Sequence, residues 1–278
     1  MSVSGKLYIC ATPIGNLEDI TLRVKRILSE VDAVAAEDTR RTAQLMNHIG
    51  AKKKIISYHQ HSGKEKENTI IDMLLSGSDI ALVSDAGTPL ISDPGDALVK
   101  RAIEEGVEVV PLPGASAVLA VLSVSGIDAP RFAFEGFFPR ENKEKKKFIE
   151  MLRQEERAVV FFESPKRISK TLQLMAHELG ERRICVAREL TKLYEEVFRG
   201  SLREASQKFS AEQKGEFALV IAGVVHEKKE LSDEDIKSAL KEYMANGANK
   251  KEAVLQASES LNAPKNRVYA LSLDIRLD

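Results

Sequence analysis

Short apolar runs alternate with amphipathic stretches along the first half of the chain. Each run predicts a buried strand, and each stretch with apolar residues three or four positions apart predicts a helix. We expect strands at residues 6–10, 31–36, 54–58, 80–83 and 107–111. We expect helices at about residues 19–29, 65–76 and 95–105, and another that follows residues 37–41 and runs to about residue 48. Strands that alternate with helices predict a mostly parallel sheet that is covered on both faces.

The pattern restarts after residue 130. Strands are expected at residues 131–137, 158–162, 184–187, 193–198 and 217–222. The basic run 140–147 opens a helix that ends near residue 154, and Pro165 suits the first turn of another, with Ser164 as its cap. We therefore expect an α/β protein with two α/β domains, at residues 1–126 and 127–225.

The composition changes after residue 225. Charged residues 226–230 predict a linker, and three amphipathic helices are expected at about residues 232–245, 250–260 and 264–273. Ser232 and Asp235 have the spacing of a capping box. Residues 231–278 thus form a helical tail, which resembles either a helix-turn-helix module or a small bundle that packs on the body or on a partner subunit.

The polar clusters of the first half all follow strands and precede helices. Since the carboxyl ends of parallel strands meet at one edge of a sheet, these clusters should gather there. The stretch 79–95 is the centre of this arrangement, because a buried strand leads into turns around Gly87, where a ligand can approach the backbone closely. An ordinary strand-to-helix turn is the alternative.

The composition narrows the class of protein. With 278 residues, 43% hydrophobic and 30% charged, the chain is typical of a soluble protein with ample core. Its formal net charge of -1 gives no general attraction to polyanions, so a nucleic-acid site must be a local patch. Cys10 and Cys185 lie in apolar runs and are expected to be core thiols. Neither a signal-type apolar segment nor a bilayer-length apolar run is present, which predicts a cytoplasmic protein with no membrane contact.

Several chemistries lack their sequence signatures. The chain has no phosphate-binding loop for nucleoside triphosphates, no dinucleotide-binding glycine pattern after the first strand, and no nucleophile elbow of a hydrolase. Its His and Cys residues lack metal-ligand spacing, so no metal is expected.

Six strings remain in a fixed order, at residues 12–17, 36–40, 84–95, 113–117, 162–167 and 187–192. Together they resemble the ribosomal RNA small-subunit methyltransferase I family, within the tetrapyrrole-methylase superfamily, and the resemblance covers nearly the whole chain. It implies a class III methyltransferase fold, in which two α/β domains form a kidney shape with S-adenosylmethionine in the cleft between them. It further implies a homodimer that methylates the 2′-oxygen of a cytidine in the decoding region of small-subunit ribosomal RNA, either as free RNA or in the assembled subunit.

The resemblance also implies a cofactor site. The superfamily's Gly-Gly-Asp-Pro loop is replaced here by Ala86, Gly87, Thr88 and Pro89, so that Asp85 supplies the acidic group from a neighbouring position. This departure fits the RNA branch better than a tetrapyrrole substrate. The implied cofactor residues are Pro13, Asp85, Gly87, Thr88, Ile91, Ser116, Ala117, Phe162 and Ala218, of which Phe162 and Ala218 would touch the adenine.

A ribose hydroxyl is a poor nucleophile until its proton is removed. The candidate bases are Glu37, Asp38 and Glu189, with His59 as a fourth. We expect Glu37 or Asp38 first, because their strand lies one position from the sheet centre, although a helix cap with an ion pair is the alternative for this segment. Correct positioning of the reacting groups supplies roughly 7–11 kcal/mol. A single general base contributes less than this. Damage to the cofactor loop should therefore slow the reaction more than loss of one base.

Phosphate contacts in RNA call for exposed cations. The candidates are Arg40, Lys166, Arg167, Arg188 and Lys192. Their alternative role is in surface ion pairs, which contribute little to stability.

Two rival functions remain open. A tetrapyrrole or other small-molecule methyltransferase would keep the cleft but need no basic rim or tail, and a non-catalytic ribosome-assembly factor would need no intact cofactor loop.

Overall fold

The computed structural model describes residues 4–59, 62–93, 95–224 and 231–275. The predicted linker at residues 226–230 and Pro94 of the central stretch lie outside the described residues. The chain divides into two compact units, Met1–Val224 and Val225–Asp278. The first unit contains two sheets and the second contains three helices, and each unit is described by itself.

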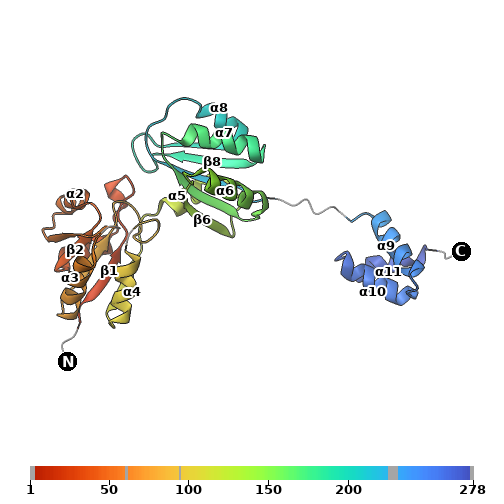
Figure 1. Ribbon diagram of the computed structural model, residues 1–278, viewed down its shortest axis with the longest axis horizontal. Coiled ribbons are helices and arrows are strands. Elements are labelled where there is room, and N and C mark those ends of the chain that lie inside the picture. The colour runs from red at the N-terminus through yellow and green to blue at the C-terminus, as the bar shows by residue number, and fades with distance from the viewer. Residues whose placement is uncertain (1–3, 60–61, 94, 225–230, 276–278) are drawn as a thin grey trace. The chain divides into compact units, whose positions relative to one another are not determined.

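The first sheet is entirely parallel, with strand order β3-β2-β4-β1-β5 (Figure 1). Its strands are β1 (Lys6–Cys10), β2 (Ala33–Ala36), β3 (Lys54–Ser57), β4 (Ile80–Val83) and β5 (Glu108–Leu112). The predicted parallel sheet is confirmed, because short buried strands separated by helices leave no room for hairpins.

Helices cover both faces of this sheet. They are α1 (Leu22–Glu30), α2 (Thr39–Ile49), α3 (Lys64–Leu75) and α4 (Asp96–Glu104), after the short 3-10 helix η1 (Leu17–Asp19). Along β4, Ala81 and Val83 pack with α1 and α2, whereas Ile80 and Leu82 pack with α3 and α4. This alternation is the side-chain period of a strand buried on both sides.

One predicted helix begins later than expected. The range 19–29 holds the end of η1 and then α1, because the Asn16 side chain accepts a hydrogen bond from the Glu18 amide and Thr21 accepts one from the Val24 amide. Each cap starts a separate helix.

The second sheet has strand order β6-β7-β10-β8-β9 and is mainly antiparallel, with β6 and β7 as its parallel pair. Its strands are β6 (Phe132–Phe137), β7 (Ala158–Glu163), β8 (Arg183–Arg188), β9 (Glu196–Ser201) and β10 (Phe217–Ile221). Helices α6 (Asn142–Gln154), α7 (Ile168–Leu179) and α8 (Leu202–Lys208) pack on one face around Phe161.

The start of α7 corrects one prediction. Pro165 is not in the first helical turn, and Ser164 is not the cap, because residues 165–167 form a turn before α7 begins at Ile168. The Ser164 hydroxyl instead accepts a hydrogen bond from the Arg167 side chain.

Helix α5 (Ala117–Ser125) covers the other face of the second sheet. Its Val118 and Val121 pack in one cluster with Val160, Cys185 and Val220. The chain therefore passes from the first sheet to the second between the end of β5 and residue 117, before the predicted boundary at residue 126. The division into domains at residues 1–126 and 127–225 stays a prediction.

Other features of composition have clear places in the structure. Cys10 and Cys185 are buried free thiols, which confirms them as core residues. Within the described ranges, no helix has both the length and the apolar character needed to cross a membrane.

The second unit consists of α9 (Asp233–Ala245), α10 (Lys250–Ser260) and α11 (Lys265–Leu273). Ile236, Leu240, Val254 and Val268 are among the buried residues of its own core. The capping box of Ser232 with Asp235 is confirmed. A helix-turn-helix module and a small packing bundle would both have three helices around one core, so the choice between these two predictions for the tail stays open.

Candidate functional site

Loops that follow four strands of the first sheet are bonded to one another at its carboxyl edge. Thr12 and Gly87 exchange both backbone hydrogen bonds, at 2.8 and 2.9 Å. The Thr88 hydroxyl donates to the Ala115 carbonyl at 3.3 Å, and the Asp38 amide donates to the Asp85 carboxylate at 2.9 Å. The predicted gathering of polar clusters at one edge is therefore confirmed for the loops after β1, β2, β4 and β5, whereas residues 60 and 61 of the cluster after β3 lie outside the described residues.

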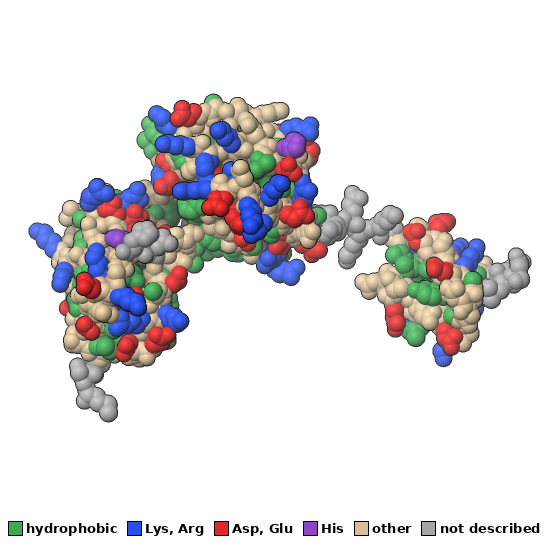
Figure 2. Space-filling model, viewed as in Figure 1, with side chains coloured by type: hydrophobic (Ala, Val, Ile, Leu, Met, Phe, Trp, Pro, Cys, Tyr) green, Lys and Arg blue, Asp and Glu red, His purple; other side chains and the backbone are tan. Residues whose placement is uncertain are grey.

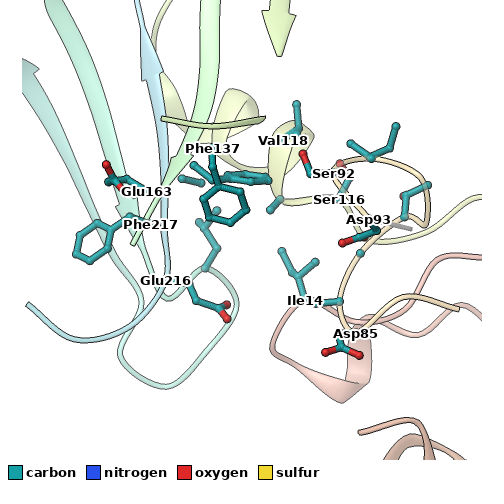
Figure 3. Close-up of a pocket in the computed structure, with 18 of the residues that line it drawn as sticks. Ile14, Asp85, Ser92, Asp93, Ser116, Val118, Phe137, Glu163, Glu216 and Phe217 are labelled. Atoms are coloured by element: carbon teal, nitrogen blue, oxygen red, sulfur yellow. The ribbon is translucent and has the colours of Figure 1, made fainter. Parts of the chain in front are cut away.

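A cavity of about 490 Å³ opens at this edge and extends to the second sheet (Figure 3). Ligand pockets generally measure roughly 300–1,000 Å³. The cavity is lined by all the predicted cofactor residues except Pro13, namely Asp85, Gly87, Thr88, Ile91, Ser116, Ala117, Phe162 and Ala218. Ile14 lines it in place of its neighbour Pro13. The structure thus brings together residues that are up to 133 positions apart in the sequence.

The loop between β4 and α4 has an unusual backbone. Gly87 has a φ of 87°, and the non-glycine residues Leu90 and Ser92 have φ values of 75° and 67°. Such left-handed conformations cost non-glycine residues on the order of 1–3 kcal/mol, and they cluster at ligand sites. A Cβ at position 87 would lie 3.4 Å from Cγ2 of Ile14, which also lines the cavity.

The wall formed by the second sheet is apolar and aromatic. Phe162 in β7 is the direct cross-strand neighbour of Ala218 in β10. The Phe162 ring meets the rings of Phe134 and Phe137 edge-to-face, with centroids 5.1 and 5.6 Å away. Phe137 is 59% exposed and faces the cavity, so this wall offers a platform for a flat ring system.

Carboxylates line the cavity on both sides, and three of them have cationic partners. Asp85 lies 3.6 Å from the Arg41 guanidinium, and Glu216 lies 2.9 Å from the Lys192 ammonium. Glu163 is buried, forms an ion pair with Arg167 at 2.6 Å and accepts a hydrogen bond from Thr171 at 2.7 Å.

The two other carboxylates of the cavity, Glu37 and Asp93, have no ion-pair partner among the described residues. Burial raises the pKa of Glu37, and the neighbouring Asp85 carboxylate adds to this. Burial also raises the pKa of Asp93 to about 6, with contributions from Glu37 and Asp85 that a hydrogen bond from Ser84 opposes. Asp93 is therefore able to accept a proton closer to neutral pH than an ordinary aspartate.

The predicted bases have different environments. Glu37 lines the cavity, whereas Asp38 and Glu189 are not among its described lining residues. Asp38 caps α2 and forms a two-pronged ion pair with Arg40, which lowers its pKa to about 2. Burial opposes a low pKa for Glu189, but hydrogen bonds from the Lys192 side chain and the Glu216 amide outweigh it. The alternative of a cap with an ion pair therefore describes Asp38 well. The catalytic roles remain predictions.

None of the predicted RNA-binding cations is among the described residues that line the cavity. Arg40 pairs with Asp38, Arg188 with Glu196 at 3.3 Å, and Lys192 with Glu189 at 2.9 Å. Lys166 is exposed, with no acidic partner in the described part of the chain. On the face shown in Figure 2, basic and acidic side chains are interspersed, so no broad basic surface is visible there. The RNA role of these residues stays a prediction.

Sequence reasoning missed several residues that line the cavity, notably Arg41, Asp93, Phe137 and Glu216. Asp93 lies inside the string 84–95, and Arg41 directly follows the string 36–40, so a signal was present for both. Phe137 ends a predicted strand and Glu216 precedes one, and neither position carries a local signal.

Comparisons with known proteins agree with this site. Residues 6–206 match the family described as Tetrapyrrole (Corrin/Porphyrin) Methylases. The chain is similar to the ribosomal RNA small subunit methyltransferase I of Synechocystis sp., with 43% identity over 99% of both chains. The enzyme of the same name from Bacillus subtilis is 45% identical over 97% of this chain and 96% of that one. The one from Thermotoga maritima is 45% identical over 79% of this chain and 99% of its own.

Solved structures share the fold at lower identity. The methyltransferase CobJ superposes with a TM-score of 0.60, at 17% identity over 80% of this chain and 95% of that chain. A uroporphyrin-III C-methyltransferase from Thermus thermophilus, complexed with S-adenosyl homocysteine, superposes with a TM-score of 0.54, at 16% identity over 78% and 97%. The predicted class III methyltransferase fold is thereby confirmed. The chain belongs to the tetrapyrrole methylase family and, within it, to the group of ribosomal RNA small subunit methyltransferases I.

Proposed function

We propose that this protein transfers a methyl group from S-adenosylmethionine to the 2′-oxygen of a cytidine ribose in the decoding region of small-subunit ribosomal RNA. The observation that carries this proposal is the cavity at the carboxyl edge of the first sheet, which the matching family motifs line. Relatives named ribosomal RNA small subunit methyltransferase I, similar over nearly the full length, support the choice of substrate.

The residues of the cavity fit S-adenosylmethionine chemically. Phe137, Phe162 and Ala218 provide an apolar wall for the adenine. Carboxylates favour a positively charged cofactor, and the start of α5 at Ser116 and Ala117 would favour its carboxylate. When bound, the cofactor supplies a methyl group on a positively charged sulfur, which a hydroxyl oxygen can accept. The protein's own part is to hold the ribose in line and to exclude water.

The RNA would approach over the carboxyl ends of β6 and β7. These parallel strands end side by side at Phe137 and Glu163, and Arg167 joins their loops by donating hydrogen bonds to the carbonyls of Phe138 and Pro139. Exposed cations without an acidic partner in the described part of the chain lie on these loops and on the helices after them: Arg140, Lys143, Lys166 and Lys170. Their position beside the cavity suits contacts to phosphates on either side of the target ribose.

The proposal includes a homodimer in the cytoplasm that acts on free RNA or on the assembled small subunit. Light scattering of the purified protein would test the dimer. A mass equal to one chain at micromolar concentration would contradict it.

Isotope-labelled S-adenosylmethionine gives the decisive test. The protein is incubated separately with small ribosomal subunits, with naked small-subunit RNA and with a tetrapyrrole precursor. Label on the 2′-oxygen of one cytidine is expected, and comparison of subunits with naked RNA identifies the form of the substrate. Label only in the tetrapyrrole, or no binding of the cofactor at all, would overturn the proposal in favour of a small-molecule methyltransferase or a non-catalytic factor.

A further inference from the structure

A ribose hydroxyl needs a proton acceptor within the cavity, and most of its carboxylates are already engaged. Asp85 accepts the Asp38 amide and lies beside Arg41, Glu163 is bonded to Arg167 and Thr171, and Glu216 pairs with Lys192. Each of these three carboxylates therefore already has a cation or a hydrogen-bond donor at its oxygens. Glu37 and Asp93 are the two that remain.

Asp93 is placed to meet a ligand in the cavity. It lies on the loop between β4 and α4, and its half-buried carboxylate points toward the space between this loop and the second sheet (Figure 3). The preceding residue, Ser92, has a φ of 67°, so this orientation is maintained against a local conformational cost. Strained backbone conformations cluster at functional sites, so the strain beside Asp93 indicates that the position of its carboxylate matters for function.

We propose that Asp93, to which the sequence analysis gave no role, accepts the proton of the ribose hydroxyl. This inference rests on the proposed function. In the transfer, a bond forms between the ribose 2′-oxygen and the methyl carbon, while the bond between that carbon and sulfur breaks and leaves its electron pair on sulfur. The hydroxyl proton passes to a carboxylate oxygen of Asp93, and solvent takes it up after the product leaves.

The surroundings of Asp93 tune it for this task. Burial and the facing carboxylates of Glu37 and Asp85 raise the pKa of Asp93 to about 6, and a hydrogen bond from Ser84 limits the rise. Arg41 lies at 3.6 Å from Asp85 and partly offsets that negative charge. At pH 7 to 8 the carboxylate is therefore ionised, yet it is a stronger base than an ordinary aspartate. In this arrangement Glu37 is a positioning residue that acts through Asp93.

The test is the pH dependence of methyl transfer in a single turnover, with cofactor and RNA both saturating. The wild-type rate should be constant above pH 7 and should fall about tenfold per pH unit below a midpoint near 6, because only the ionised carboxylate accepts a proton. Asp93→Asn should lower the plateau by roughly 10²–10⁴-fold and remove this acid limb. Asp93→Glu should restore part of the rate and keep the limb.

Two further variants separate Asp93 from its neighbours. Glu37→Gln should shift the acid limb to lower pH, because one negative charge beside Asp93 is lost. Asp96→Asn is the matched control, since Asp96 is exposed in the first turn of α4 and is not among the described residues that line the cavity. Its profile should match that of the wild type.

Calorimetric titration with S-adenosyl homocysteine supplies a readout that does not depend on activity. Asp93→Asn should bind this product within about threefold of the wild type. A large loss of binding would make Asp93 a cofactor ligand and would overturn the inference. It would also be overturned if Asp93→Asn kept the acid limb, or if Glu37→Gln removed it.

The proposed function and this inference fail in different ways. A wild-type protein that places no label on RNA would overturn the proposed function and the inference with it. A wild-type protein that labels RNA, together with an Asp93→Asn variant of equal rate, would overturn the inference alone.

Discussion

Lys166 and Arg167 are neighbours in the sequence, but their side chains have different surroundings. Lys166 is exposed, whereas the guanidinium of Arg167 lies 2.6 Å from Glu163, whose side chain is 0% exposed. Arg167 also donates to two backbone carbonyls of the loop after β6. A pattern of exposed charges treats the two residues alike, yet the structure gives Arg167 the contacts of an internal clamp.

Alanine substitutions at these two positions should therefore affect different properties. Arg167→Ala should lower the free energy of unfolding by about 3 kcal/mol or more, because it leaves a buried carboxylate without its cation. The thermal midpoint should fall by roughly 6–12 °C. Lys166→Ala should leave the midpoint within about 1 °C and weaken RNA binding, with a smaller dependence of affinity on salt. Calorimetry and RNA binding at several salt concentrations check both, and equal loss of stability in the two variants would contradict the distinction.

Asp93 should also have a measurable effect on stability. Its folded pKa of about 6 lies above the ordinary 3.8, so the unfolded state ionises at lower pH than the folded state. The free energy of unfolding therefore decreases as pH rises from about 4 to 6. Above pH 6, Asp93 is ionised in the folded state and destabilises it by the full amount. The difference between the two pKa values corresponds to roughly 3 kcal/mol, which partial exposure reduces to the order of 1 kcal/mol.

Asp93→Asn removes this penalty. At pH 7.5 it should raise the thermal midpoint by roughly 2–4 °C, and at pH 4.5 the gain should be smaller. Scanning calorimetry at both pH values is the measurement. A variant that is less stable than the wild type at pH 7.5 would show that Asp93 forms favourable contacts in its ionised state instead.

Residue identities were predictable where a motif fixes them and not where tertiary contacts decide. Gly87 and Thr88 were found because their loop carries a recognisable string, and they do line the cavity. Glu37 and Asp38 could not be told apart, because the φ and ψ angles at a helix start decide which side chain becomes the cap. Glu216 gave no signal, since its approach to the cavity depends on the path of the whole second sheet.

At the scale of elements, two loops join the part of the first unit that holds the first sheet to the part that holds the second sheet. The loop after β1 and the loop after β8 meet where the Asn16 amide donates to the Thr191 hydroxyl at 3.1 Å. Gly15 lies against the aliphatic part of the Lys192 side chain, and a Cβ there would lie 2.4 Å from Lys192 Cγ. Since residues of both parts line the cavity, we expect this contact to influence its width.

Gly15→Ala should therefore widen the cavity and weaken binding of the cofactor product by about tenfold, equivalent to about 1.4 kcal/mol. Gly63→Ala is the matched control, because nothing lies within 4 Å of the added Cβ at that position and its backbone is ordinary. Calorimetric titration of both variants checks this. Unchanged affinity in Gly15→Ala would mean that Lys192 simply moves aside.

Hydrophobic periodicity predicted most helices and strands well, but it predicted their arrangement in space only in part. Strand β1 and helix α10 have the predicted bounds, because a short apolar run and a capped amphipathic stretch are both local signals. The antiparallel pairing of β8, β9 and β10 was not predicted, because alternation of side chains does not encode the direction of a neighbouring strand. Helix α5 is apolar on all sides, so its sequence does not say which sheet it covers.

At the scale of the whole molecule, the residues of the cavity all belong to the first unit, Met1–Val224. The three helices of the second unit have a core of their own and carry nearly equal numbers of basic and acidic residues. Such a balance gives no strong attraction to RNA. The Thermotoga maritima relative matches 79% of this chain with 99% of its own length, so a shorter chain exists within this family.

A protein that ends at Val224 should consequently fold and bind the cofactor product with an affinity within about twofold of the full chain. Its single-turnover rate with saturating RNA should also be retained, because every residue that lines the cavity remains. If removal of the tail has an effect, it should change the concentration of RNA or subunit at which the enzyme is half-saturated. Calorimetric titration and single-turnover rates over a range of substrate concentrations distinguish these quantities. A fall of more than tenfold in the saturated rate would contradict this, because it would mean that the tail contributes to the arrangement of the cavity itself.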